Sequence, residues 1–266
     1  MRRLFGVILL ATTATHSGGC APHRVSLPSG DGEAFPEYRE AFDEATRACR
    51  GVRSMTAELA ISGRAAGQKL RGRVLAGIAT PDRVRLEAVA PFGPPVFILA
   101  ANGTNTSLLL PRDNRVLTGE PVSAILGALV GLELGPADLV AILSGCVESS
   151  PEASAGRSFP GGWGRIDIAG GSAAFLKREG ARWTVRAGRR PGLAIEYGLA
   201  AGGAISRVRL EVAGGGQADT DVRVELSQVD VNPRLGPEVF QVKVPPDAVP
   251  ITLADLRGTP LVGEKR

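Results

Sequence analysis

The chain has 266 residues, of which 44% are hydrophobic and 22% charged, a globular composition that argues against wholesale disorder and against a polytopic membrane protein. The formal net charge of +4 falls to +2 without Arg2 and Arg3, which is too balanced to indicate nucleic-acid binding. The two histidines, His16 and His23, both lie near the N-terminus. A histidine triad, general base or zinc site in the body of the chain is therefore excluded, and we expect no metal and no cofactor.

The sequence also lacks the common catalytic motifs. No Gly-x-Ser-x-Gly elbow, phosphate-binding P-loop or Gly-x-Gly-x-x-Gly fingerprint occurs in it. Asp219, Asp221 and Glu225 recur at even spacing along one expected strand, as solvated charges do. We expect no enzymatic activity.

Residues 1–19 have the pattern of a lipoprotein signal peptide, with a basic start before an apolar stretch over residues 4–14. Residues 17–20, Ser-Gly-Gly-Cys, resemble a lipobox, whose cysteine is lipidated and begins the mature protein. Ser17 stands where lipoboxes usually have leucine, so an ordinary cleavage near Ala14 is the alternative. Several acyl chains on Cys20 would anchor the protein firmly to a membrane.

No aspartate follows the expected lipidation site, which favours the outer membrane, with the protein facing the periplasm. Residues 20–36 contain three prolines and little apolar content, so we interpret them as a lipidated N-terminus and flexible tether. One folded domain over residues 37–256 and a tail over residues 257–266 complete the expected organisation.

If Cys20 carries lipid, Cys49 and Cys146 remain as an even pair in an oxidising compartment. Cys49 ends an apolar stripe that starts at Tyr38 and has helical spacing, so it lies on the buried face of a helix. Cys146 follows an apolar run that Gly145 would end as a helix C-cap. These positions favour a Cys49–Cys146 disulfide between two helices, and two unrelated buried thiols are the alternative.

From residue 55 onward the apolar spacing changes to two, which predicts antiparallel strands with one apolar and one solvated face. The clearest segments cover residues 55–62, 69–78 and 83–88. A hairpin is expected over residues 96–110, with Asn102-Gly103 as its turn, and strands are expected again from about Trp163 to Val244. The Gly-Gly-Gly run at 214–216 is interpreted as a loop.

Two short apolar helices are expected between the two groups of strands, one between Pro121 and Gly131 and one starting at Pro136. Their apolar positions include Val122, Ile125, Leu126 and Leu129 in the first helix and Leu139 and Leu143 in the second. The order helix, strands, two helices, strands predicts an α+β fold, a single curved antiparallel sheet with helices on one face.

Residues 85–93, Arg-Leu-Glu-Ala-Val-Ala-Pro-Phe-Gly, followed by the hairpin and the two helices, resemble the LolB family of outer-membrane lipoprotein receptors. Residues 128–131 and 134–139 resemble that family's helical pair, and residues 180–185 resemble its strand with a tryptophan. Residues 239–247 instead resemble the end of the soluble LolA carriers, which share the fold, so the branch stays open.

This resemblance covers most of residues 37–256 and implies an unclosed β-barrel whose concave face, lidded by the two helices, holds lipoprotein acyl chains. The groove residues so implied are Leu59, Ile61, Val74, Val84 and Leu86. Alternation alone does not distinguish such a groove from an ordinary filled core, and without the resemblance the composition favours the filled core.

Phe92 is the most specific candidate for a functional residue, because it lies between Pro91 and Gly93 in a stretch that cannot form a helix. The resemblance places an apolar residue here at the tip of a loop that enters the membrane, and a loop folded back on the sheet is the alternative. Arg71, Arg73, Arg83 and Arg85 are expected on the outer sheet face, as solvated charges or as contacts to anionic headgroups.

The resemblance implies a lipid-anchored outer-membrane protein that receives lipoproteins and helps to insert them. Its partners would be acyl chains of lipoproteins or phospholipids and a LolA-like periplasmic carrier, and we expect a monomer. The alternative is a general lipid-binding or envelope-assembly lipoprotein without insertase activity.

Overall fold

The computed structural model describes residues 24–65, 67–212 and 220–257. The expected leader, Cys20, the glycine run at 214–216 and all but the first residue of the C-terminal tail lie outside these ranges. The described residues build one fifteen-stranded sheet. In spatial order its strands are β1 (Glu33–Ala34), β8 (Ala153–Phe159), β9 (Trp163–Ile168), β10 (Ser172–Glu179), β11 (Arg182–Arg190), β12 (Leu193–Leu199), β13 (Ile205–Val212), β14 (Thr220–Val231), β2 (Ser54–Ala65), β3 (Gln68–Ala79), β4 (Arg83–Val89), β5 (Phe97–Asn102), β6 (Asn105–Leu110), β7 (Arg115–Thr118) and β15 (Val249–Pro250).

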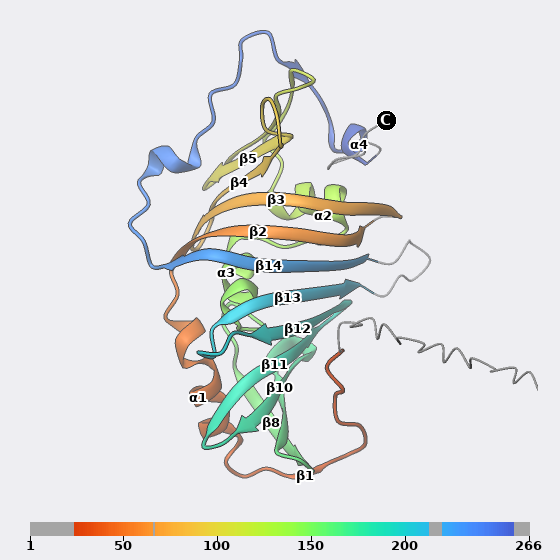
Figure 1. Ribbon diagram of the computed structural model, residues 1–266, viewed down its shortest axis with the longest axis vertical. Helices are drawn as coiled ribbons and strands as arrows, with labels where there is room; N and C mark the ends of the chain where they lie inside the picture. The colour runs from red at the N-terminus through yellow and green to blue at the C-terminus, as the bar shows by residue number, and fades with distance from the viewer. Residues whose placement is uncertain (1–23, 66, 213–219, 258–266) are drawn as a thin grey trace, which may run out of the picture.

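The described helices are α1 (Tyr38–Arg50), α2 (Val122–Val130), α3 (Pro136–Ser144) and α4 (Leu253–Leu256), with single 3-10 turns at Ala169–Gly171 and Pro237–Phe240. Neighbouring strands are antiparallel except β15, which runs parallel to β7. Figure 1 shows the sheet curving strongly between its two unpaired edges. The expected α+β fold, a curved and unclosed sheet with helices, is confirmed.

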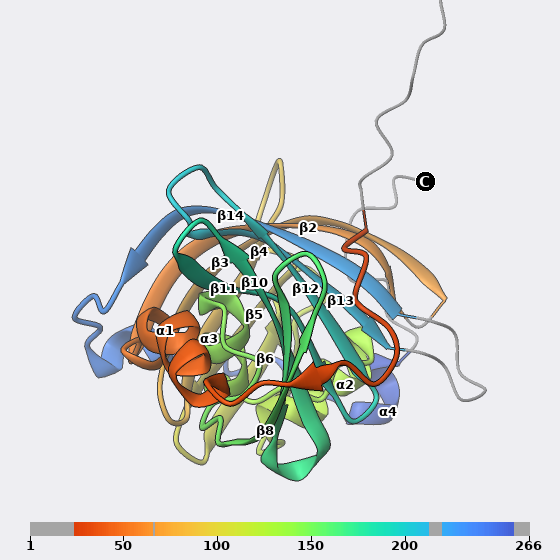
Figure 2. The same ribbon diagram turned by 90° about the horizontal axis from the view of Figure 1, so that it is seen from below.

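Alternation of side chains gives the sheet one continuous apolar face. In β2, Met55, Ala57 and Leu59 are buried and the residues between them are more exposed. The register places Leu59 opposite Val74, and Val74 opposite Ala88, so the buried positions of β2, β3 and β4 are aligned. Viewed from below, the sheet forms an arch, and α2 and α3 lie within it (Figure 2). The helices therefore cover the concave apolar face.

The pairing of β14 with β2 joins the two halves of the sheet, although these strands are far apart in the sequence. Gly63 permits their close approach, because it has φ 133° and a Cβ there would overlap the carbonyl oxygen of Asp221. Any other residue at this position would push the two strands apart.

Three details of the strand prediction are wrong. The hairpin turn is centred on Gly103 and Thr104, one residue later than expected, because Asn102 pairs with Asn105. The strand β8 was not expected, since its Ala, Ser and Gly residues carry little β-propensity and pairing with β9 determines it. The last long strand ends at Val231 rather than near Val244, because the prolines that follow remove backbone donors.

The segment expected to be a flexible tether instead contacts the domain from Arg24 onward. Arg24 forms an ion pair with Glu211 at 2.9 Å, and Leu27 packs against a small apolar cluster on β10 and β11. Residues 33 and 34 form β1, which pairs with β8. The segment before α1 therefore lies along the domain, because it has both charged and apolar partners there.

The Cys49–Cys146 disulfide is present, with the two Cα atoms 5.6 Å apart, within the usual range. It joins the end of α1 to the residue that follows the C-cap of α3, Gly145, which has φ 101°. Both sulfurs are buried together with Ala141 of α3. The bridge therefore fixes the C-terminal end of α3 to α1.

Replacing both bridged cysteines by alanine should lower the free energy of unfolding by about 4 kcal/mol, because the bridge closes a long loop in the unfolded chain. Urea denaturation, with and without reductant, measures this change. Reductant should destabilise the wild type by a similar amount and leave the variant unaffected. A loss below about 1 kcal/mol on both routes would contradict the assigned role of the bridge.

Candidate functional site

A cavity of about 130 Å³ lies between the concave face of the sheet and the helices α2 and α3. Every residue that lines it is Leu, Ile, Val or Phe. With no titratable or hydrogen-bonding side chain in the lining, this site has no group for acid, base or nucleophilic chemistry. It can attract only an apolar ligand, by the removal of apolar surface from water.

The structure brings most of the expected groove and lid residues together around this cavity. Of these residues, the lining contains Leu59, Ile61, Val74, Leu86, Leu126, Leu129, Leu139 and Leu143. Val84 is buried on the same face of β4 but lies outside the lining. Val122 and Ile125 are also buried in α2 without lining the cavity.

Several lining residues were missed from the sequence. Leu132 and Leu134 belong to the connection between α2 and α3, and Leu210 and Val222 come from β13 and β14. Apolar and charged residues alternate in the sequences of β13 and β14, as in the other expected strands. This alternation did not show that β14 lies beside β2, which depends on long-range pairing.

The size of the cavity limits what the closed molecule can hold. Ligand sites for small molecules usually measure about 300–1,000 Å³, whereas a closed cavity of about 150 Å³ accommodates a benzene-sized group. At about 130 Å³, the cavity has room for a short apolar group and not for a whole acyl chain. A longer chain requires that part of the helical cover move.

The helix α3 is held at both ends. At its start, Asp138 accepts hydrogen bonds from the backbone N–H of Gly135 at 3.0 Å and from Nη1 of Arg190 at 2.9 Å. Beyond its end, Cys146 is in the disulfide, and its carbonyl oxygen accepts a hydrogen bond from the hydroxyl of Tyr197 at 2.9 Å. Burial raises the pKa of Tyr197, so this hydroxyl stays protonated and continues to donate.

The helix α2 is held differently. It has no charged side chain, and it ends at Gly131 in the left-handed conformation with φ 69°. Among the described residues, one side-chain hydrogen bond reaches it, from the hydroxyl of Thr220 to the carbonyl oxygen of Val130 at 3.4 Å. Apolar contacts to the sheet and to α4 supply the rest of its attachment. The helix α2 is therefore the part of the cover that is easier to displace.

The loop after β4 projects from the domain. Pro91, Phe92 and Gly93 are all exposed, and the Phe92 side chain is 90% exposed, the highest value among the exposed large hydrophobic residues described. Gly93 has φ 79°, and Arg112 donates a hydrogen bond from Nη2 to the carbonyl oxygen of Phe92 at 3.4 Å. The ring does not fold back onto the sheet.

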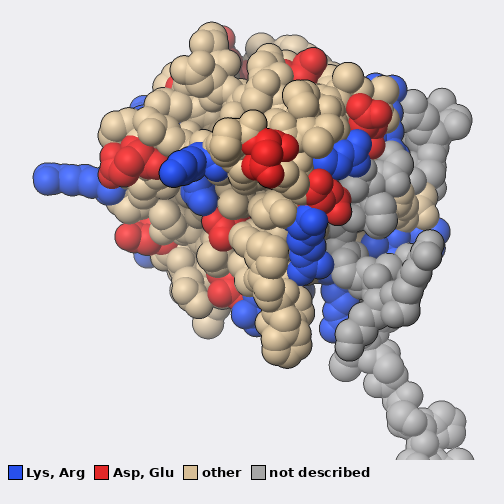
Figure 3. All heavy atoms as spheres, turned by 90° about the horizontal axis from the view of Figure 1, so that it is seen from above, with Lys and Arg blue, Asp and Glu red and all other residues tan. Residues whose placement is uncertain are grey.

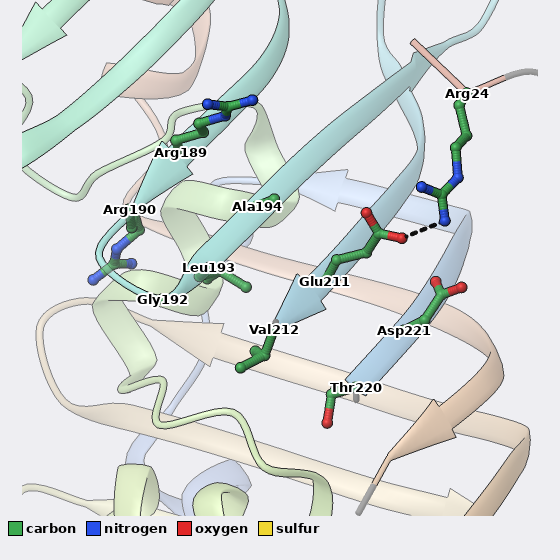
Figure 4. A pocket seen from close by; sticks show the side chains of 10 residues that line it. All are labelled: Arg24, Arg189, Arg190, Gly192, Leu193, Ala194, Glu211, Val212, Thr220 and Asp221. Carbon is green, nitrogen blue, oxygen red and sulfur yellow. Dashed lines mark hydrogen bonds and ion pairs between the residues drawn. The ribbon is translucent and has the colours of Figure 1, made fainter. Parts of the chain in front are cut away.

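A second hollow, of about 550 Å³, lies near Arg24, where β11 and β13 end and β12 and β14 begin (Figure 4). Figure 4 shows Glu211 and Asp221 side by side on β13 and β14, with the Arg24 guanidinium turned toward Glu211. Arg209, whose side chain is 9% exposed, contacts Glu211 at 2.7 Å and Asp221 at 2.8 Å. The carboxylates here are counter-ions of arginines rather than a free acid and base.

The electrostatics of this cluster support a structural role. The hydrogen bonds from Arg209 lower the pKa of Asp221, and those same bonds raise the pKa of Arg209. Desolvation raises the pKa of Glu196, the third carboxylate near Arg209. In the part of the chain that the structure describes, no three His, Cys, Asp or Glu side chains are grouped to hold a metal ion.

None of the described helices is long and apolar enough to cross a membrane. Over the face drawn in Figure 3, basic and acidic side chains are interspersed, and no large area carries one sign of charge. This distribution agrees with the balanced composition of the chain.

Substitution of Asp221 by asparagine should lower the free energy of unfolding by about 1–2 kcal/mol at neutral pH, because the bidentate contact with Arg209 is lost. The pKa of Asp221 is lower in the folded than in the unfolded state, so this stabilisation is complete above about pH 4 and is lost as the pH falls through the folded-state pKa. Between neutral and strongly acidic pH, the free energy of unfolding should therefore fall less in the variant than in the wild type.

Denaturation curves across the pH range measure this difference, with Asp167→Asn as the control. Asp167 also pairs with an arginine, Arg165, but both side chains are more exposed. Equal losses in the two variants would contradict a special role for the Arg209 cluster.

Comparison with known proteins reveals a shared fold. No family model matches the sequence, and no curated protein matches it. A LolA superfamily protein from Nitrosomonas europaea superposes with a TM-score of 0.51 at 11% identity, covering 76% of this chain and 97% of that chain. A DUF1329 family protein from Desulfovibrio piger has a TM-score of 0.46 at 11% identity, covering 76% and 96% of the two chains.

A domain described as an outer membrane lipoprotein-sorting protein, from Vibrio parahaemolyticus, has a TM-score of 0.43 at 13% identity, covering 76% and 94%. The fold assignment depends on the first match alone. On that match, the chain has the fold of a LolA superfamily protein.

Proposed function

We propose that this chain is a lipid-anchored outer-membrane protein that binds the acyl chains of lipoproteins beneath its helical cover and helps to insert them into that membrane. The carrying observation is the wholly apolar cavity between the concave sheet face and α2 and α3. Lipidation at Cys20 would keep the protein at the periplasmic surface of the membrane. A LolA-like carrier would deliver the cargo to it.

Binding requires an exchange of apolar surfaces. Displacing α2 exposes its four buried side chains, which costs about 6–12 kcal/mol at 1.5–3 kcal/mol for each of Val122, Ile125, Leu126 and Leu129. A palmitoyl chain with about 14 methylenes recovers about 11 kcal/mol at 0.8 kcal/mol each. The gain is similar in size to the cost, so the acyl chain can take the place of the helix while α3 stays fixed by its disulfide and ion pair.

The Phe92 loop is the feature that links the cavity to the bilayer in this proposal. A stiff, exposed loop with an aromatic ring at its tip is suited to the membrane interface. This feature supports a LolB-like role in insertion over simple storage of lipid. Phe92 would stand where LolB-like proteins present a leucine.

Leu139→Trp should reduce the affinity for a fluorescent fatty acid by at least about tenfold, because the larger side chain fills the cavity that the acyl chain enters. Leu193→Trp is the control, since Leu193 is also half-buried and packs against the core, but it lines the second hollow and not the cavity. Fluorescence titration measures both affinities. Equal affinities in the wild type and Leu139→Trp would exclude the cavity as the binding site.

Phe92→Glu should leave the melting temperature within a few degrees of the wild type, because the side chain is exposed. It should also abolish delivery of a lipoprotein to outer-membrane vesicles, since a carboxylate does not enter the bilayer. The control is Val231→Glu, which places the same charge at another exposed apolar position, at the end of β14. If Phe92→Glu delivers lipoprotein as well as the wild type does, Phe92 has no role in insertion. If the wild type binds fatty acid but delivers no lipoprotein, binding without insertase activity would be the correct function.

A further inference from the structure

A large basic hollow lies at the end of the sheet next to the Phe92 loop. It measures about 1210 Å³ and is formed by the ends of β2 and β3, the loop after β4, the turn that contains Arg112, and the start of β14. Its charged lining residues are Arg64, Lys69, Arg71, Arg73, Arg112, Arg223, Asp221 and Glu225. Six basic groups against two acidic ones leave a net positive charge.

Most of this positive charge has no counter-ion in the protein. Arg73 pairs with Glu58 at 3.0 Å, and Arg223 pairs with Asp221 at 3.3 Å. Among the described residues, no carboxylate pairs with the four other basic side chains, which are Arg64, Lys69, Arg71 and Arg112. All four are exposed. They are thus available to an anion from outside.

The expected basic cluster on this side of the sheet is only partly present. Arg71 and Arg73 line the hollow, but Arg83 and Arg85 do not. Arg85 is engaged with Glu87 at 3.0 Å, and Arg83 lies over the ring of Phe240. Folding replaces these two with Arg64 and Arg112, which come from other parts of the chain.

Two apolar features adjoin the hollow. Pro91 and Val89 line it, and Arg112, which also lines it, donates a hydrogen bond to the carbonyl oxygen of Phe92. Ile61 and Leu70 line both the hollow and the apolar cavity. The basic groups therefore lie between the projecting aromatic ring and the space under α2 and α3.

The N-terminal segment adds a constraint on orientation. Asp221 lines both the basic hollow and the hollow that contains Arg24, so Arg24 enters at the same end of the sheet. Cys20 lies four positions before Arg24, a reach of about 14 Å at most. If Cys20 is lipidated as proposed, the anchor holds this end of the domain close to the membrane surface.

We propose that the basic hollow binds the phosphate headgroups of anionic phospholipids in the bilayer, and so orients the domain as the Phe92 loop enters the membrane. This inference extends the proposed function, because it names the surface on which delivery takes place. Each unpaired basic side chain near an anionic membrane contributes about fivefold to binding. The attraction falls with added salt, since the groups are exposed.

The test uses the full chain with Cys20→Ser, so that no acyl anchor contributes, and phosphatidylcholine vesicles with or without phosphatidylglycerol. The double variant Lys69→Glu, Arg71→Glu should weaken binding to the anionic vesicles by at least about 25-fold. Arg157→Glu, Arg182→Glu is the matched control, because it changes the net charge equally at exposed positions on β8 and β11. The control should bind within about threefold of the unsubstituted protein.

Equal losses in the two double variants would overturn the proposal, because net charge alone would then explain binding. Equal binding of the unsubstituted protein to both kinds of vesicle would overturn it as well. If Lys69→Glu, Arg71→Glu binds dissolved short-chain phosphatidylglycerol less tightly but binds anionic vesicles normally, the proposal is also overturned. The hollow would then hold the headgroup of a single bound lipid and not the bilayer surface. The fatty-acid affinity of Lys69→Glu, Arg71→Glu, measured without vesicles, should equal that of the unsubstituted protein. A failure of cavity binding is therefore distinguishable from a failure of this proposal.

Discussion

The structure depends on one constraint, the need to cover a wide concave sheet face that is apolar over many strands. The two halves of the sheet meet at β14 and β2 and form an arch that no strand of the described residues closes. Two nine-residue helices, α2 and α3, cover this face with leucine, isoleucine and valine. They leave a cavity of about 130 Å³ with no polar side chain in its lining. The same surfaces that stabilise the closed molecule are those that an acyl chain would contact.

The unequal attachment of the two helices decides how such a cover can open. The helix α3 has a disulfide beyond its C-terminal end and an ion pair at its N-terminal end, and neither is apolar contact that lipid can replace. The helix α2 is held chiefly by apolar contacts, and lipid supplies an equivalent of these. In the proposed function, lipid would displace α2 and α3 would stay in place. Ile61 and Leu70 line both the apolar cavity and the basic hollow, and the basic hollow adjoins the Phe92 loop.

The sequence predicted the elements that have a strong local signal. The period-two segments became β2, β3 and β4, and the helix limits around Pro136 and Gly131 were correct, because proline and glycine determine backbone geometry locally. The disulfide was predicted from compartment and burial, and eight of the expected groove and lid residues line the cavity. The strand β8 and the packing of Leu27 could not be predicted, since tertiary partners determine both. The contact of Arg83 with the ring of Phe240 was hidden for the same reason, as it depends on a side chain brought close by folding.

The central claim is that the apolar face accepts a hydrocarbon chain from another molecule. Mass spectrometry of lipid extracted from the purified full chain, after incubation with a palmitoylated lipopeptide and removal of the excess, tests it most directly. The account predicts about one lipopeptide retained per protein molecule, and hydrogen exchange that is faster in α2 than in α3 when it is bound. The account would be contradicted if the protein retained no lipopeptide and hydrogen exchange in α2 were the same with and without incubation with lipopeptide. The concave face would then be simply a filled core.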